Sequence, residues 1–216
     1  MIKKIIELES ISSVLAVIPA KKVSKRLPSK NLKLFNGYPL IFYSIQFAKF
    51  SGIKNIIVSS DCDKIISYSK TFGIETVKRP KNLSTDMTPT KHVVKHALET
   101  FSKSKVKIKC LVTLQPTNPL RKQGLFETCF EKFNKNDYDS LISVGLQNKK
   151  LGVLDSEECY KPINYKLGSR GQDVKINYFE NGLIYLSKAE NILKNELLGD
   201  RIGTIINEDL PSNIDI

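Results

Sequence analysis

The chain has 216 residues and a formal net charge of +12, from 34 basic and 22 acidic side chains. This length can bury the core of one domain, and no break in composition marks a second one. The positive charge favours an anionic partner such as a nucleotide. Nucleic acid is a poor candidate, because Trp is absent and most aromatic residues lie in periodic apolar runs rather than among basic clusters.

The four cysteines have neither the spacing of a disulfide framework nor that of a zinc site, since none forms a C-x-x-C pair. Free thiols in a reducing cytoplasm are therefore expected. No apolar run approaches the roughly 18 residues of a membrane span. The first residues are too sparsely apolar for a signal sequence. We expect a cytoplasmic protein without a membrane anchor.

Short apolar runs that predict strands alternate along the chain with periodic segments that predict helices. The expected strands are 14–18, 55–59, 75–78, 108–114, 140–144, 183–186 and 201–206. The expected helices are 39–51, 61–72 with Asp61 or Asp63 as its cap, 88–101, 124–133 and 188–198. This alternation indicates βαβ units, and hence an α/β fold with a mainly parallel sheet flanked by helices. Residues 147–178 interrupt the pattern with glycines, a proline and no long period.

A basic loop follows the first expected strand. Pro19 ends that strand, and five cations lie within the next residues, at Lys21, Lys22, Lys25, Arg26 and Lys30. Ligands of open α/β sheets bind at the carboxyl ends of strands. Fixed cations there suit a triphosphate, whose oxygens gain charge during phosphoryl transfer. Because no G-x-x-x-x-G-K-[ST] or G-x-G-x-x-G motif is present, side chains and non-glycine backbone would bind the phosphates. The alternative is a solvated basic loop.

This loop resembles the signature of the sugar-activating cytidylyltransferases. The N-acylneuraminate (CMP-sialic acid synthetase) family typically shows I-P-A-R-x-G-S-K-x-x-x-x-K-N, and here residues 18–25 read IPAKKVSK, followed by Lys30 and Asn31. Residues 24–30, SKRLPSK, also match the S-x-R-L-P-x-K of the related 3-deoxy-manno-octulosonate (Kdo) enzymes. Lys21 and Val23 replace the usual Arg and Gly. The loop alone therefore indicates the superfamily and leaves the sugar open.

Residues 114–121, LQPTNPLR, are similar to the L-Q-P-T-S-P-L-R of the sialic-type branch, with seven of eight positions identical. Two prolines fix how the chain leaves the strand, so Gln115 and Arg121 can be held at the carboxyl edge of the sheet. An amide that donates and accepts suits a polyhydroxylated sugar acid. The resemblance implies that Gln115 faces the sugar, and it favours the sialic-type branch over the Kdo type. The alternative is a simple Pro-rich turn.

Two further patterns resemble the family, V-S-[ST]-D at the end of the second strand and R-P-x-x-L-[AS]-x-D after the third. Here they fall on Asp61 and on Arg79 to Asp86. The resemblance implies that Arg79 reaches the nucleotide and that Asp86 braces the loop. Asp61 is either a helix cap or a site residue.

Residues 170–186 resemble R-x-Q-[DE]-x-P-x-x-Y-x-x-N-G-A-[IV]-Y. By this resemblance Gln172 and Tyr185 shape the sugar side. The family often has Arg immediately before that Gln, bound to the sugar carboxylate. Here Gly171 stands at that position and Arg170 one residue earlier, so Arg170 is the candidate substitute. The Asn181-Gly182 pair can also be read as a hairpin turn.

The last residues raise the question of the metal. The family typically has S-I-D-I-D, whose two carboxylates hold Mg²⁺, whereas this sequence reads Asn213-Ile214-Asp215-Ile216. Asp215 is then the single expected metal ligand. Mg²⁺ is commonly held by one or two carboxylates together with substrate phosphates and water.

Taken together, the resemblance implies a Rossmann-like, GT-A-like nucleotidyltransferase fold over residues 1–216, with 147–178 as a strand-rich arm that crosses to a second subunit of a homodimer. The implied reaction transfers CMP from CTP to the anomeric hydroxyl of a nonulosonic acid. Lys21, Lys25 and Asp215 are the implied catalytic residues. The implied nucleotide-binding residues are Ala20, Lys21, Ser24, Lys30, Asn31, Arg79 and Asp86. Two alternatives stay open: a Kdo-type or other sugar nucleotidyltransferase, and an impaired homologue that binds nucleotide without turnover.

Overall fold

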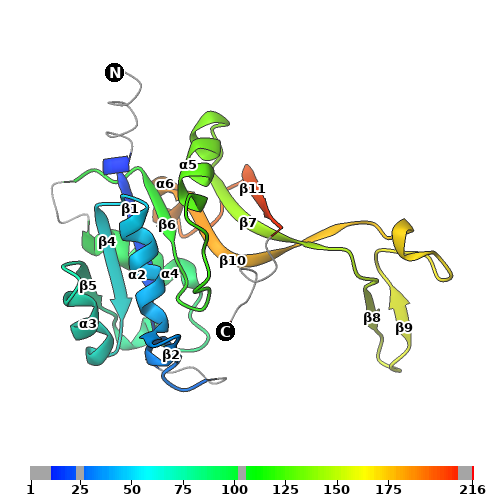
Figure 1. Ribbon diagram of the computed structural model, residues 1–216, viewed down its shortest axis with the longest axis horizontal. Coiled ribbons are helices and arrows are strands. Elements are labelled where there is room, and N and C mark those ends of the chain that lie inside the picture. The colour runs from blue at the N-terminus through cyan, green and yellow to red at the C-terminus, as the bar shows by residue number, and fades with distance from the viewer. Residues whose placement is uncertain (1–10, 23–26, 102–105, 209–215) are drawn as a thin grey trace.

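The structure, a computed structural model, describes residues 11–22, 27–101, 106–208 and 216. These residues form a seven-stranded sheet in the order β11-β7-β10-β6-β1-β4-β5 (Figure 1). Its strands are β1 (Val14–Pro19), β4 (Asn55–Ser60), β5 (Glu75–Lys78), β6 (Cys110–Thr113), β7 (Ser140–Gln147), β10 (Asn177–Lys188) and β11 (Ile202–Asn207). All neighbouring pairs are parallel except those of β10, which runs antiparallel to both β6 and β7.

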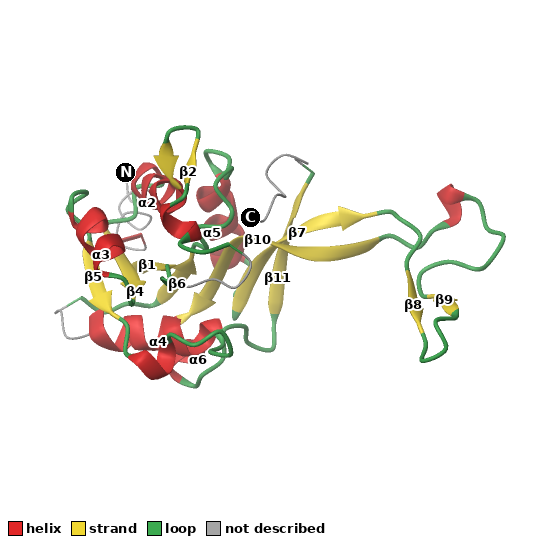
Figure 2. Cartoon of the chain, turned by 90° about the horizontal axis from the view of Figure 1, so that it is seen from below, coloured by secondary structure: helices red, strands yellow, loops and turns green. Residues whose placement is uncertain are grey.

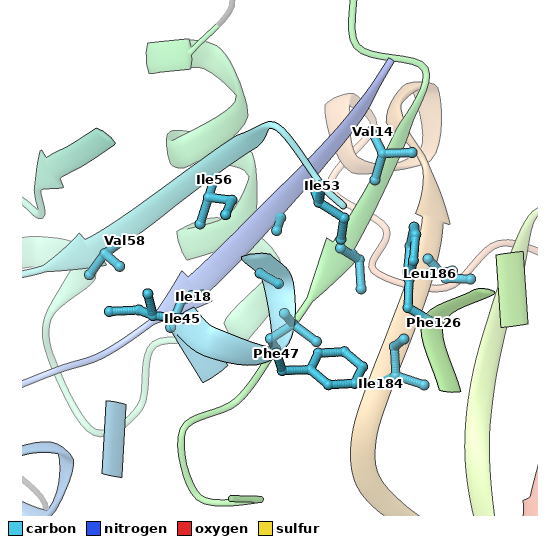
Figure 3. Close-up of a cluster of buried hydrophobic side chains, with 14 of the residues drawn as sticks. Val14, Ile18, Ile45, Phe47, Ile53, Ile56, Val58, Phe126, Ile184 and Leu186 are labelled. Atoms are coloured by element: carbon cyan, nitrogen blue, oxygen red, sulfur yellow. The ribbon is translucent and has the colours of Figure 1, made fainter. Parts of the chain in front are cut away.

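Helices cover both faces of the sheet. One face carries α2 (Leu40–Phe50), α3 (Asp63–Lys70) and α5 (Leu125–Lys135), and the other carries α4 (Thr90–Phe101) and α6 (Ala189–Leu193), as Figure 2 shows. Side chains of β1 alternate between two apolar layers. Ile18 lies beside Ile45 in the first layer, which also holds Phe126 (Figure 3), whereas Leu15 packs in the second, beneath α4. Burial on both sides explains why this strand reads as a continuous apolar run.

The expected alternation of strands and helices is confirmed, with differences at particular elements. The last expected helix, 188–198, is only the five residues of α6, and β10 is longer than the expected 183–186. The predicted cap of α3 is wrong. Cys62 occupies the N-cap position without a side-chain bond, while Asp61 accepts a hydrogen bond from the Lys22 amide and Asp63 pairs with Lys78.

Two small hairpins and three 3-10 turns complete the fold. The hairpins are β2 (Leu34–Phe35) with β3 (Tyr38–Pro39), and β8 (Gly152–Leu154) with β9 (Tyr160–Pro162). The turns are η1 (Lys30–Leu32), η2 (Lys81–Leu83) and η3 (Gly171–Asp173). No helix in the described ranges is long and apolar enough to cross a bilayer.

Residues 146–179, here called the arm, comprise the far paired ends of β7 and β10 and the segment between them, and they extend away from the helices (Figures 1 and 2). Many apolar side chains of the arm are exposed: Leu146, Val153, Leu154, Tyr160, Ile163, Leu167, Ile176, Tyr178 and Phe179. An apolar surface of this kind commonly marks a contact with another protein chain.

At the root of the arm, β10 contains a bulge between Glu180 and Tyr185. Gly182 lies in the bulge with φ +73°, a left-handed conformation that favours glycine. Asn181 and Gly182 therefore lie within a continuous strand, and their reading as a hairpin turn is wrong. Asn118 Nδ2 donates to the Asn181 carbonyl at 2.9 Å, and Ser143 Oγ donates to Asn181 Oδ1 at 2.5 Å. These buried bonds fix the bulge to the loop after β6 and to β7.

Candidate functional site

A cavity of about 330 Å³ opens beyond the carboxyl ends of β1 and β6. Segments that are distant in sequence meet there: the end of β1, the basic loop, the segment after β5, the start of α4 and the loop after β6. Its lining residues are Pro19, Lys21, Lys30, Asn31, Arg79, Leu83, Thr85, Asp86, Thr88, Thr90, Val93, Gln115, Pro116 and Thr117. Six residues expected from three separate motifs thus lie around one cavity, at the position where α/β sheets bind ligands.

The peptide group between Lys21 and Lys22 is held from both sides. Asn31 Nδ2 donates to the Lys21 carbonyl at 2.8 Å, and Asp61 Oδ1 accepts the Lys22 amide at 2.7 Å. Ala20 is buried, and its amide donates to the Ser59 carbonyl at 2.9 Å. These bonds orient the start of the basic loop, so that the Lys21 side chain points into the cavity. Asp61 is therefore a positioning residue for this loop.

Lys21 and Asp86 form an ion pair across the cavity. The distance from Lys21 Nζ to Asp86 Oδ1 is 2.5 Å, and the two side chains are 29% and 28% exposed. Asp86 thus balances part of the positive charge of Lys21. A phosphate that binds Lys21 must compete with this carboxylate.

Arg79 is the buried cation of the site, with 5% of its surface exposed. Nε donates to Ser59 Oγ at 3.2 Å and Nη2 donates to the Ser59 carbonyl at 2.7 Å. Burial lowers the pKa of Arg79, and the nearby charge of Asp61 opposes that shift. Among the bonds between described residues none involves Nη1, and Arg79 is one of the residues that line the cavity.

Four threonines of the cavity were not expected as site residues: Thr85, Thr88, Thr90 and Thr117. Thr85 Oγ1 and Thr88 Oγ1 share a hydrogen bond of 2.7 Å. Three of them, Thr85, Thr88 and Thr90, belong to the Thr-rich run STDMTPT at 84–90, which is the sequence pattern from which they could have been predicted. Hydroxyls donate and accept, so they suit phosphate oxygens and sugar hydroxyls alike.

The remaining expected residues lie elsewhere. Tyr185 is buried in β10 opposite Thr113, with its hydroxyl 3.2 Å from Glu180 Oε2, and does not line the cavity. Arg170 and Gln172 lie at the turn η3, far along the arm from the cavity of the same chain (Figures 1 and 2). Arg170 pairs there with Asp173. Ser24 and Lys25 lie outside the described residues.

The described residues do not supply a metal-binding set. No group of three His, Cys, Asp or Glu side chains among them could hold a metal ion. Asp86 is the one carboxylate that the described lining contributes, and it is paired with Lys21. The expected ligand Asp215 lies outside the described residues. The next residue, Ile216, donates its amide to the Thr117 carbonyl at 3.1 Å, and its carbonyl accepts from Lys30 Nζ at 3.2 Å.

Comparison with known sequences agrees with this geometry. The family model described as Cytidylyltransferase matches residues 15–206. The N-acylneuraminate cytidylyltransferase of Streptococcus agalactiae serotype III is 31% identical over 187 residues, which cover 83% of this chain and 44% of that protein. The aligned part thus spans less than half the length of this relative. The CMP-N,N'-diacetyllegionaminic acid synthase of Legionella pneumophila is 32% identical over 194 residues, which cover 85% of this chain and 81% of that protein.

A solved structure of CMP:2-keto-3-deoxy-manno-octonic acid synthetase, complexed with CTP, matches with a TM-score of 0.66 and 16% identity. The match covers 91% of this chain and 90% of that one. This likeness concerns the fold, and it confirms the expected nucleotidyltransferase architecture.

Proposed function

This chain belongs to the cytidylyltransferase family, and on that premise we propose that it transfers CMP from CTP to the anomeric hydroxyl of a nonulosonic acid, releasing pyrophosphate. The observation that carries the proposal is the single cavity that gathers Lys21, Lys30, Asn31, Arg79 and Gln115 from distant parts of the sequence. The similarity to enzymes named for neuraminic, legionaminic and pseudaminic acids supports this substrate class.

On the nucleotide side, cations face the cavity from two directions. Lys21, just after β1, and Lys30, at the start of η1, suit the phosphates, because fixed positive charge stabilises oxygens that gain negative charge. We propose that Arg79 contacts the base, since Nη1, which has no bond among the described residues, carries two hydrogens that can donate to the adjacent O2 and N3 acceptors of cytosine. Uracil has a donor at N3, so this contact favours CTP over UTP. Ala20, Ser24, Lys25 and Asn31 remain proposed members of the nucleotide site.

In the proposed step, the anomeric oxygen forms a bond to the α-phosphorus as the bond to the bridging oxygen of the pyrophosphate breaks. The hydroxyl proton passes to water, and the pyrophosphate leaves with the electron pair of the broken bond. Lys21 exchanges Asp86 for phosphate oxygen and stabilises the charge that develops there. Mg²⁺, with Asp215 as its proposed protein ligand, would add neutralisation of the phosphates when bound.

On the sugar side we propose contributions from two subunits. Gln115 faces the cavity of its own chain. Arg170 and Gln172 are remote from that cavity, but an arm with an exposed apolar surface can carry them to a second copy. The proposed homodimer would thus bring the arm of one chain to the cavity of the other. Tyr185, enclosed beside Thr113, would support the sugar wall from behind.

We also propose a cytoplasmic location. The four cysteines are unpaired, and three of them are buried as small apolar side chains. Unpaired thiols are typical of a reducing compartment.

The deciding experiment measures pyrophosphate release with CTP, Mg²⁺ and a panel of nonulosonic acids, with Kdo as a further acid. Release with one nonulosonic acid supports the proposal and names the substrate. Release with Kdo alone makes the protein a Kdo-type enzyme. CTP binding by calorimetry without release from any acid contradicts the proposed transfer and supports the impaired homologue.

A further inference from the structure

The guanidinium of Arg121 lies inside the loop that it ends. Nη2 donates to the Gln115 carbonyl at 2.7 Å, and Nη1 donates to the Asn118 carbonyl at 2.7 Å and to Ser44 Oγ at 3.0 Å. Nε donates to the Leu183 carbonyl at 2.5 Å. The ring of Phe47 covers the group, with its centroid 5.6 Å from Cζ. One side chain therefore joins the loop after β6, helix α2 and strand β10.

Every one of these hydrogen-bond acceptors is neutral. Burial lowers the pKa of Arg121 to about 9, which leaves the group charged at neutral pH. No carboxylate of the described residues forms an ion pair with it. The Arg121 side chain is half-buried, and a cation partly removed from water without an anion costs desolvation energy, which favours a role beyond stability.

The loop depends on this cation for its shape. The Gln115 carbonyl accepts from Arg121, from Ser44 Oγ at 3.3 Å and from the Asn118 amide at 3.3 Å. Gln115 itself, with Pro116 and Thr117, lines the cavity. Fixing the carbonyl fixes the direction in which the Gln115 side chain leaves the main chain.

Hydrogen bonds from Arg121 and from its neighbour Asn118 also reach the root of the arm. Leu183, which accepts from Arg121, lies in the bulge of β10, and Asn118 donates to Asn181 in that bulge. A Cβ on Gly182 would lie 2.9 Å from Asn118 Oδ1, so the Asn118 side chain packs closely against the backbone of the bulge. Displacement of the bulge would therefore pull on the loop that carries Gln115.

We propose that Arg121 is a positioning residue for the sugar wall, which is residues 115–117. Its guanidinium holds Gln115 toward the cavity. Through its bond to the Leu183 carbonyl, it also couples the position of this wall to that of the root of the arm. The proposal rests on the proposed function in one respect, that Gln115 contacts the acid. Lysine cannot replace it, because a single ammonium lacks the planar fork that reaches three carbonyls and a hydroxyl at once. The nucleotide wall, with Lys21 and Arg79, has no bond to Arg121 and should be unaffected.

The test compares Arg121→Lys with Arg201→Lys. Arg201 also lies over a ring, that of Tyr138, with 5.6 Å between Cζ and the centroid, but it is exposed and does not line the cavity. For Arg121→Lys we expect KM for the acid to rise by about tenfold, from the carbonyls left without a donor. The Kd for CTP, measured by calorimetry, should stay within about twofold in both variants. Hydrogen exchange should become faster in the peptide spanning residues 114–121 in Arg121→Lys only.

Ser44→Ala is the milder variant, in case Arg121→Lys does not fold. It removes one hydroxyl from the Gln115 carbonyl and should raise KM for the acid in the same direction by a smaller factor. Unchanged KM and unchanged exchange in both variants would overturn the proposal, as would an equal loss of CTP affinity. If the unmodified protein binds CTP but turns over no acid, the proposed function fails, and the exchange data alone decide the role of Arg121.

Discussion

The cavity and the arm use apolar side chains in opposite ways. Around the cavity, the strands that supply its walls bury almost every apolar residue between two layers of helices. Along the arm, comparable residues such as Leu154 and Leu167 are 65% and 73% exposed. The first region packs its apolar side chains within one chain, whereas the second leaves them on an exposed surface. In the proposed homodimer, each cavity would receive the arm-borne part of its sugar side from the partner.

The largest loss of turnover is expected from a substitution in the cavity itself. Lys21→Ala should lower turnover by about 100-fold, because a fixed charge facing the phosphates is lost. Lys22→Ala is the matched control: its bond to Asp61 uses the main-chain amide, which alanine retains. Steady-state pyrophosphate release for the control should stay within about twofold. Equal loss in both variants would remove Lys21 from the mechanism.

The arm can be tested by mixing two inactive variants. If Arg170 serves the partner's cavity, Lys21→Ala and Arg170→Ala homodimers are both impaired. A mixed dimer then has one site with both defects and one intact site, so co-expression and tandem purification should recover roughly half of the activity per dimer. Absence of recovery would mean that Arg170 acts within its own chain, and the trans arrangement would be wrong.

Alanine substitutions at two leucines distinguish the stability of the folded chain from the association of two chains. Leu141 is fully buried in β7, and Leu167 is exposed on the arm. Leu141→Ala should lower the free energy of unfolding by about 2–5 kcal/mol. Leu167→Ala should change it by less than about 0.5 kcal/mol. Denaturant titration at low protein concentration checks both values, and sedimentation should show weaker dimers for Leu167→Ala only. Equal destabilisation would indicate that the arm packs within its own chain.

The smallest effect concerns the thiols. Burial raises the pKa of Cys110 and of Cys129 to about 12, against 9.0 for an ordinary thiol. Above pH 9 the unfolded chain loses these protons while the folded chain keeps them, so the free energy of unfolding should fall as pH rises from about 9 toward 12. Denaturant titrations across this range should show a shallower slope in Cys129→Ala.

Exposed Cys159 on the arm provides the contrast. Mass spectrometry after brief alkylation at pH 8 should find the label there before it appears at Cys110 or Cys129. Early labelling of the buried thiols would indicate that the sheet opens readily.

The sequence predicted most of what local pattern determines. Apolar runs gave each large strand of the sheet, and the motifs around Lys21, Arg79 and Gln115 met at one cavity. The predicted helix cap at Asp61 is wrong, because its carboxylate accepts a hydrogen bond from the distant Lys22 amide and does not cap the helix that follows it. No local rule distinguishes these two uses of one side chain.

The structural role of Arg121 was equally inaccessible from sequence. An arginine after a Pro-rich turn is usually exposed, and its acceptors come from segments as distant as Ser44 and Leu183. The bulge at Gly182 also depends on contact with Asn118, which comes from another segment. Such features arise from the assembled sheet, so they become visible only when the strand order is known.

The place of β10 in the sheet has a consequence for the order of folding. This strand is synthesised after β7, yet it lies between β6 and β7. A growing chain can therefore pair β1 with β4 and β6 early, while β6 keeps an open edge until residues up to Lys188 have emerged. The lysine-lined wall belongs to the early part, whereas the carbonyl of Leu183, needed by Arg121, arrives late. Unpaired edges of this kind invite aggregation, so the interval before β10 inserts is the vulnerable stage in the synthesis of this protein.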